Sequence, residues 1–212
     1  MKRTLLITLA ALLSCIVAEA QLRTIKPSST FKIPNISNAT YESEQYNDES
    51  NQLYWDLHCS PYTTAGTQNV VASSSLSSQG SASYRASNII DSNHETAWVE
   101  GVKGYGVGQW IELRDIYPDG EITALNILNG YVKSDKAWSE NSRVKRLKVY
   151  CNDNPICILE LQNSRSMQVF SVQDVLGGKH YIGKLRFEIM EVYPGTKYQD
   201  TVISEIYFTA VP

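Results

Sequence analysis

Three oxygen-bearing side chains, those of Asp91, Asn93 and Thr96, lie close together in a short polar segment that ends at Trp98. Their spacing allows the oxygen atoms to converge, and calcium takes roughly six to eight oxygen ligands from such compact turns. The same residues also suit a turn without an ion, in which Asp91 accepts backbone N–H groups and Thr96 caps the following segment. The sequence therefore predicts either a structural calcium site or a self-contained Asx turn.

A second set of residues suits the binding of sugars. Aromatic rings stack on the C–H faces of sugars, while amide, carboxylate and cationic side chains bond the hydroxyl groups. The residues of these types in predicted loops or strand ends are Tyr105, Tyr131, Lys133, Trp138, Asn141, Arg143, Tyr193, Lys197 and Asp200. The alternative interpretation is that Tyr131 and Tyr193 brace loops, while Lys133 and Arg143 are solvated charges.

Residues that could carry catalysis are sparse. The histidines are His58, His94 and His180, and none lies in a recognisable nucleophile or metal-binding context. The glycines at 101, 104, 106 and 108 resemble a phosphate-binding loop, but a strand-like run beginning at Trp110 follows them where that motif requires a helix. No pair of carboxylates can be singled out by spacing as an acid and a base. We therefore expect a protein that is not an enzyme.

The N-terminal residues are typical of an export signal. Lys2 and Arg3 precede a short apolar run, and Ala18-Glu19-Ala20 supplies the small residues of a cleavage site, so residues 1–20 are predicted to be a signal peptide. The alternative is a lipoprotein anchored at Cys15. No second apolar run is long enough to span a membrane. We expect an exported protein that is secreted, periplasmic or held at the cell surface.

The net charge of −3 at pH 7 argues against nucleic acid or an anionic membrane as a partner, since both require clustered cations. Residues 21–67 are polar and lack a hydrophobic period, which predicts a linker followed by a lead-in segment, with residues 21–50 as the flexible part. Residues 68–212 form the predicted domain. This division leaves one domain of ordinary size.

Short alternating runs separated by turn residues make up residues 68–212. The predicted strands are 70–74, 109–113, 121–128, 144–151, 156–161, 166–172, 181–192 and 201–210. Residues 86–90 and 172–176 are predicted to form brief helical turns, and Trp98 and Trp110 are placed in the core. This pattern indicates an all-β fold, an antiparallel β-sandwich of the jelly-roll type.

Cys151 and Cys157 flank a turn-rich connector between two predicted strands. In an oxidising compartment they could form a cross-hairpin disulfide, and they are equally well explained as small apolar strand residues. Cys59 is then left over, and three cysteines without clustered histidines make a poor zinc site.

Residues 68–212 resemble the discoidin, or coagulation-factor type C, modules with a galactose-binding-like jelly roll. The resemblance rests on Asn88-Ile-Ile-Asp91 through Thr96-Ala-Trp98 and on Ile203-Ser-Glu205-Ile-Tyr207. A narrower resemblance, to the translocation domain of secreted NAD glycohydrolases, rests on the segments WVEGVKGYGVGQWIEL, NGYVKSDKAWSENSRVKRLKVY and VYPGTKYQDTVISEI.

The resemblance implies a site and a role. It adds the backbone carbonyl of Asn88 and the carboxylate of Glu205 to the calcium site of Asp91, Asn93 and Thr96. It also implies a module that binds a surface ligand and does not catalyse. We expect an exported binding module that recognises carbohydrate or another cell-surface ligand through loops at one end of the sandwich. The alternative is an adaptor that contacts an envelope protein, or a translocation module, without affinity for sugars.

Overall fold

The computed structural model describes residues 22–33, 66–91, 93–117, 121–177 and 183–211. Strands dominate these residues, as the sequence predicts. The strands are β1 (Arg23–Ile25), β2 (Ser29–Phe31), β3 (Gly66–Ala72), β4 (Trp98–Val99), β5 (Trp110–Tyr117), β6 (Glu121–Asn129), β7 (Ser142–Cys151), β8 (Asn154–Glu160), β9 (Met167–Ser171), β10 (Lys184–Tyr193) and β11 (Thr201–Val211). The helices are the 3-10 helix η1 (Ala86–Ile90), α3 (Asp135–Glu140) and α4 (Val172–Leu176).

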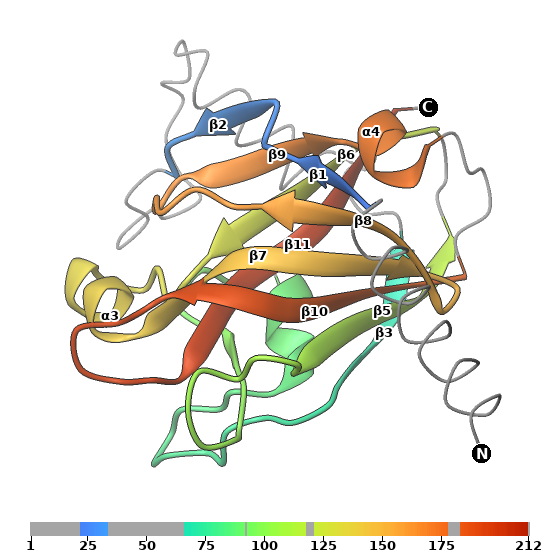
Figure 1. The fold of residues 1–212 in the computed structure, drawn as a ribbon. Coiled ribbons are helices and arrows are strands. Elements are labelled where there is room, and N and C mark those ends of the chain that lie inside the picture. The colour runs from blue at the N-terminus through green and yellow to red at the C-terminus, as the bar shows by residue number, and fades with distance from the viewer. Residues whose placement is uncertain (1–21, 34–65, 92, 118–120, 178–182, 212) are drawn as a thin grey trace, which may run out of the picture.

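The strands form two layers (Figure 1). One layer has the order β3-β5-β10-β7-β8-β1, and the other has the order β2-β9-β6-β11, with β4 added beside β11. A short parallel pairing of β11 with β7 joins them, with Thr201 opposite Ser142 and Val202 opposite Arg143. This pairing and that of β1 with β8 are parallel, whereas a purely antiparallel sandwich was predicted. The predicted all-β sandwich is otherwise confirmed.

Alternation along the strands builds the core between the layers. In β10, Leu185, Phe187 and Ile189 are buried while the residues between them are half-buried, as period-two burial requires. They belong to the same hydrophobic cluster as Phe170 of β9 and Phe208 of β11. Side chains from both layers therefore share one core.

The two tryptophans predicted to lie in this core, Trp98 and Trp110, differ in how deeply they are buried. Trp98 is fully buried, which confirms the prediction. Trp110 is half-buried, and the guanidinium of Arg186 lies 4.6 Å from its ring centroid. The prediction was wrong for Trp110, because the alternation of β5 places Ile111 and Leu113 on the core side and Trp110 on the opposite side.

The polar N-terminal region also contains structure that the sequence did not predict. β1 pairs in parallel with β8, and β2 pairs antiparallel with β9. The prediction of a flexible linker from residue 21 is therefore wrong for residues 23–31. Three-residue strands are too short to show a hydrophobic period, which explains the error. The predicted signal peptide, His58 and Cys59 lie outside the described residues.

The β7–β8 hairpin decides between the two interpretations of its cysteines. Asn152 and Asp153 form the turn with positive φ angles of 49° and 67°, as a two-residue hairpin turn requires. Cys157 lies opposite Val149 and Cys151 lies opposite Asn154, and no disulfide joins the two cysteines. Both are buried in the hydrophobic core, so they act as small apolar strand residues.

The predicted helical turns at 86–90 and 172–176 are present as η1 and α4, whereas α3 was not predicted. Ser134 caps α3 by accepting a hydrogen bond from the N–H of Ala137. Among the described residues, no helix is long and apolar enough to cross a membrane.

Candidate binding site at the loop end of the sandwich

The loop of residues 101–109 is fixed at both of its ends. Before it, Glu100 is fully buried, and its carboxylate accepts hydrogen bonds from the N–H groups of Val102 (2.8 Å) and Thr201 (3.3 Å). Burial raises the pKa of Glu100, and these two hydrogen bonds act in the opposite direction. At the other end, the Oε1 of Gln109 accepts from the hydroxyls of Ser73 and Ser74, each at 2.7 Å.

Glycine is required within this loop because the backbone passes close to other groups. Gly106 has a φ of +64°, and a Cβ there would lie 2.5 Å from the side chain of Glu100. A Cβ at Gly101 would lie 2.5 Å from the carbonyl oxygen of Ser75. The glycines that resembled a phosphate-binding loop thus serve to fold the loop over the buried Glu100.

A second loop, of residues 194–200, connects β10 with β11 and docks on the end of α3. The N–H of Tyr198 donates to the carbonyl of Glu140 at 2.8 Å. The hydroxyl of Ser142 accepts from the N–H of Gly195 and lies 3.2 Å from the carbonyl of Tyr198. A Cβ at Gly195 would lie 2.4 Å from the Glu140 carbonyl oxygen, so this contact also requires glycine.

Both loops lie beside the start of β11, and we call them the paired loops (residues 101–109 and 194–200). The hydroxyl of Thr201 donates to the carbonyl of Tyr105 at 2.8 Å. The large hydrophobic side chains that are exposed in the described part of the chain all lie in the paired loops. They are Val102, Tyr105, Val107 and Tyr198, exposed by 39%, 36%, 62% and 40%.

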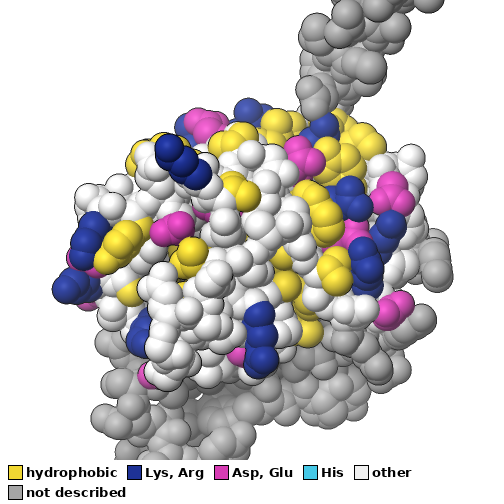
Figure 2. Space-filling model, turned by 90° about the horizontal axis from the view of Figure 1, so that it is seen from below, with side chains coloured by type: hydrophobic (Ala, Val, Ile, Leu, Met, Phe, Trp, Pro, Cys, Tyr) yellow, Lys and Arg dark blue, Asp and Glu magenta, His cyan; other side chains and the backbone are white. Residues whose placement is uncertain are grey.

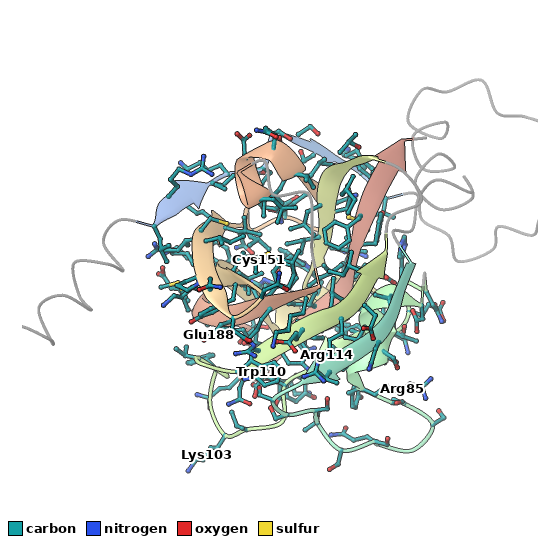
Figure 3. The ribbon with its side chains drawn as sticks, turned by 90° about the vertical axis from the view of Figure 1, so that its right-hand side faces the viewer. Arg85, Lys103, Trp110, Arg114, Cys151 and Glu188 are labelled. Carbon is teal, nitrogen blue, oxygen red and sulfur yellow. The ribbon has the colours of Figure 1, made fainter. Side chains whose placement is uncertain are left out.

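Two lysines accompany this apolar surface. Lys103 is exposed and lies at the tip of its loop, away from the sandwich (Figure 3). The ammonium of Lys197 lies 4.7 Å from the ring centroid of Tyr198, and its interaction with Tyr198 raises the pKa of Lys197. Figure 2 views the molecule from this end, where hydrophobic side chains lie among uncharged surface and scattered Lys and Arg side chains. The paired loops therefore combine aromatic faces with cationic donors.

Arg143 lies at the start of β7, and its side chain is buried. It is 6% exposed, and its guanidinium donates to the carbonyls of Trp138 and Asn141 and to the side chain of Asn163. It also lies 4.4 Å from the ring centroid of Trp138, and burial lowers the pKa of Arg143. The interpretation of Arg143 as a solvated charge is wrong, because these contacts make it the brace of the α3 region.

Trp138 takes part in the same brace. Its indole N–H donates to the carbonyl of Asn129 at 3.1 Å, and the guanidinium of Arg143 covers the ring. Gly130, with a φ of +85°, lies directly beside both side chains. Trp138 is therefore held from several sides, and the structure gives it less freedom to stack on a ligand than the exposed Tyr105.

Most of the other predicted ligand residues also make internal contacts. Tyr193 donates to the carbonyl of Leu161 at 3.0 Å, and Asn141 donates its side-chain N–H to the Ala137 carbonyl. Tyr131 is half-buried and packs edge-on against Tyr84, with ring centroids 6.5 Å apart. Burial raises the pKa of Tyr131. These contacts agree with the bracing role that was the alternative for Tyr131 and Tyr193.

The remaining predicted ligand residues lie nearer the surface. Lys133 and Lys197 are exposed, and Asp200 is half-buried beside Thr201. The sequence interpretation missed Tyr198, although it follows Lys197 directly and resembles Tyr105 in type. It also missed Val102 and Val107, whose placement between glycines was the available signal.

The turn of Asp91, Asn93 and Thr96 is closed by hydrogen bonds within the chain. The Thr96 hydroxyl lies 2.7 Å from a carboxylate oxygen of Asp91 and 2.9 Å from the carbonyl of Asn93. The N–H of Asn93 donates to Asp91, as in an Asx turn. The turn therefore has the hydrogen bonds of an Asx turn.

The other two predicted calcium ligands lie in buried positions. Asn88 is 2% exposed, and its side chain donates to the carbonyls of Ser83 and Ala97. Glu205 is 1% exposed in β11. No group of three or more His, Cys, Asp or Glu side chains that could hold a metal occurs among the described residues. Asp91 and Glu205 are the two carboxylates among the predicted calcium ligands. Calcium at this turn stays a prediction.

The sandwich, with loops presented at one end, defines the chain as a discoidin-like module. The chain belongs to the NAD glycohydrolase translocation F5/8 type C domain family, whose model matches residues 61–209. This confirms the family resemblance of the loop and strand segments. No curated protein matches the sequence.

Solved structures with low sequence identity share the fold. CpGH89CBM32-5 from Clostridium perfringens, solved in complex with GalNAc-β-1,3-galactose, is 17% identical with a TM-score of 0.51, covering 69% of this chain and 98% of that one. The CBM32-1 and CBM32-2 domains of Clostridium perfringens ZmpB are 11% identical with a TM-score of 0.51, covering 88% of this chain and 41% of that one.

Proposed function

We propose that this chain is an exported, non-catalytic module that binds carbohydrate through the paired loops. The observation that carries the proposal is the exposure of Tyr105 and Tyr198 on two loops beside the start of β11, where the Thr201 hydroxyl bonds the first loop. Tyrosine rings supply the flat apolar faces that stack on sugars, and their hydroxyls can bond to the ligand as well. Lys103 and Lys197 supply donors beside them.

The rigidity of the loops supports binding. Glu100 and Gln109 hold the first loop, and the end of α3 holds the second. A surface that is already ordered loses less conformational entropy when a ligand binds. The fold likeness to CpGH89CBM32-5, solved with a disaccharide, makes a glycan the first ligand class to test. The identity of the sugar does not follow from the fold, because one fold hosts many ligands.

A glycan array followed by titration calorimetry tests the proposal. We expect saturable binding of at least one glycan, a large loss of affinity for Tyr105→Ala and Tyr198→Ala, and retained affinity for Tyr105→Phe, which keeps the stacking face. Lys26→Ala is a control, because Lys26 is exposed in the N-terminal part of the chain, where its ammonium forms a salt bridge with Glu160. Binding that is unaffected by both alanine variants would reject the paired loops as the site.

A specific observation also favours an adaptor or translocation module that contacts an envelope or other protein. Val107 is the most exposed of the large hydrophobic residues, and Val102 lies in the same loop. Aliphatic side chains add contact area to a protein interface, whereas sugars are bound mainly by aromatic rings and polar groups. Val107→Ala separates the alternatives. If the loops bind a sugar, the affinity for the glycan should be unchanged, whereas the affinity for a protein partner that docks on this loop should fall.

A further inference from the structure

Residues 22–33, which we call the strap, bind the sandwich as an added peptide would. Within the strap, β1 pairs in parallel with β8, and the carbonyl of Val169 in β9 accepts hydrogen bonds from the N–H and the hydroxyl of Ser28. β2 then pairs antiparallel with β9. One short segment thus crosses from an edge strand of the first layer to an edge strand of the second (Figure 1).

The strap covers two strand edges. Among the described strands, β8 otherwise pairs only with β7, and β9 otherwise pairs only with β6. A strand with one unpaired side presents a row of N–H and carbonyl groups that accept an extended peptide. The edges of β8 and β9 that the strap pairs with make up what we call the strap site.

Side chains of the strap add specific contacts to the backbone pairing. Ile25 is 9% exposed and belongs to the main hydrophobic core, while Phe31 and Ile33 pack on a separate cluster around Met167. Arg23 donates to the carbonyl of Asp174, next to the strap site. Apolar anchors spaced along a main-chain-paired segment are the usual features of peptide recognition by strand addition.

The strap also lies outside the part of the chain that the family model matches, which begins at residue 61. Its two strands have three residues each, so it makes few of the contacts that hold the sandwich together. Segments with few buried contacts open at lower free energy than the core. The strap therefore combines the contacts of a bound peptide with the features of an exchangeable one.

We propose that the strap site is a binding site for extended peptides, and that it takes the strap of a second copy of this chain as well as its own. A peptide that fits the strap site is extended, with an aliphatic residue at the position of Ile25 and apolar residues at the positions of Phe31 and Ile33. Residues 34–65 connect the strap to β3, and a chain of this length can reach roughly 100 Å when extended, enough to reach a neighbouring copy. Exchange of an identical element is a low-cost route to dimers.

A disulfide trap in the full chain tests the exchange. Ser29 lies opposite Val169 in the β2–β9 pairing, and neither is buried. We mix one copy carrying Ser29→Cys with a differently tagged copy carrying Val169→Cys under mild oxidation. The strap of the first copy can meet the new cysteine of the second only when it is seated there. We expect several-fold more mixed dimer than with a control copy carrying Lys103→Cys, whose exposed cysteine lies on the paired loops.

Two further arms complete the test. The double variant Ser29→Cys/Val169→Cys in one chain should oxidise within the monomer at low concentration, which checks the pairing itself. A synthetic peptide of residues 22–33 in excess should suppress the mixed dimer, and the same peptide with Ile25→Asp should not. Mixed dimer at the level of the Lys103→Cys control overturns exchange. Failure of the double variant to oxidise, or equal effects of the two peptides, overturns the strap site.

Discussion

The hydroxyl of Thr201 donates a hydrogen bond of 2.8 Å to the carbonyl of Tyr105, a residue 96 positions earlier in the chain. Thr201 is also the first residue of β11, and its N–H donates to the buried carboxylate of Glu100. A single core strand thus holds both Glu100, just before the first of the paired loops, and Tyr105 within it. The position of Tyr105 relative to β11 depends on this connection.

Thr201→Val is expected to loosen the paired loops without unfolding the sandwich. Valine keeps the shape of threonine but removes the donor, so the Tyr105 carbonyl loses a hydrogen bond worth about 1 kcal/mol. In a chain of this size that loss lowers the melting temperature by roughly 2–4 °C. If the paired loops bind ligand, affinity should fall several-fold in calorimetry.

Thr123→Val is a matched control for that experiment. The Thr123 hydroxyl lies 3.3 Å from the carbonyl of Thr209, on the strands β6 and β11 and away from the paired loops. We expect it to cost stability without altering ligand affinity. Equal effects of the two variants on affinity would contradict a specific role for the Thr201 hydroxyl.

Gly106→Ala should damage the first loop more than Gly104→Ala. Both glycines have positive φ angles, of 64° and 100°, so alanine is strained at either position by about 1 kcal/mol or more. Only at Gly106 would the new Cβ also meet the side chain of Glu100, at 2.5 Å, while nothing lies within 4 Å at Gly104. Urea denaturation should place the stability of Gly106→Ala about 1–3 kcal/mol below that of Gly104→Ala. Equal losses would mean that Glu100 moves aside freely.

Glu100 should make stability depend on pH. Burial raises its pKa above the ordinary value of 4.5, so the folded protein holds this proton more tightly than the unfolded chain. The contribution of Glu100 therefore favours folding at pH values below about 4.5 and is lost as pH rises through the higher pKa of the folded state. Compared with Glu100→Gln, which does not titrate, the natural protein should gain relative stability as the pH falls from 7 towards 4.5. Urea denaturation across this range measures the difference, and a constant difference would contradict the raised pKa.

The sequence predicted most of the strands, whereas the burial of individual loop residues could not be predicted, for one physical reason. Period-two burial in β10 appears directly in the order of residues, because each side chain alternates between core and surface. A loop has no period, so its exposed residues cannot be separated from its bracing ones by spacing. Arg143 and Tyr193 resembled ligand contacts in the sequence, yet their hydrogen bonds point back into the molecule. Tyr198 was missed for the same reason.

Calcium at the turn of Asp91 and Thr96 is testable by melting. An ion that binds only the folded state stabilises it by an amount that grows with the logarithm of the ion concentration, so a chelator should lower the melting temperature by several degrees. Asp91→Ala should remove this difference, whereas Glu95→Gln, which changes an exposed charge in the same turn that is not a predicted ligand, should keep it. If the natural protein melts at the same temperature with and without chelator, the prediction of a stabilising calcium ion at this turn is wrong.

Cys157 should be inert while the protein is folded. Burial raises the pKa of its thiol to about 12, and nearby Arg23 lowers it only in part. At pH 8 about one thiol in 10⁴ is then ionised, against about one in ten at the ordinary value of 9.0, and the thiolate is the reactive form. Peptide mapping after iodoacetamide should find Cys157 unmodified in the folded protein and modified in urea. An introduced Lys103→Cys, exposed on the paired loops, should react under both conditions and so confirms that the reagent is active. Rapid labelling of Cys157 in the folded protein would show that the β7–β8 hairpin opens, because its sulfur is fully buried when the hairpin is closed.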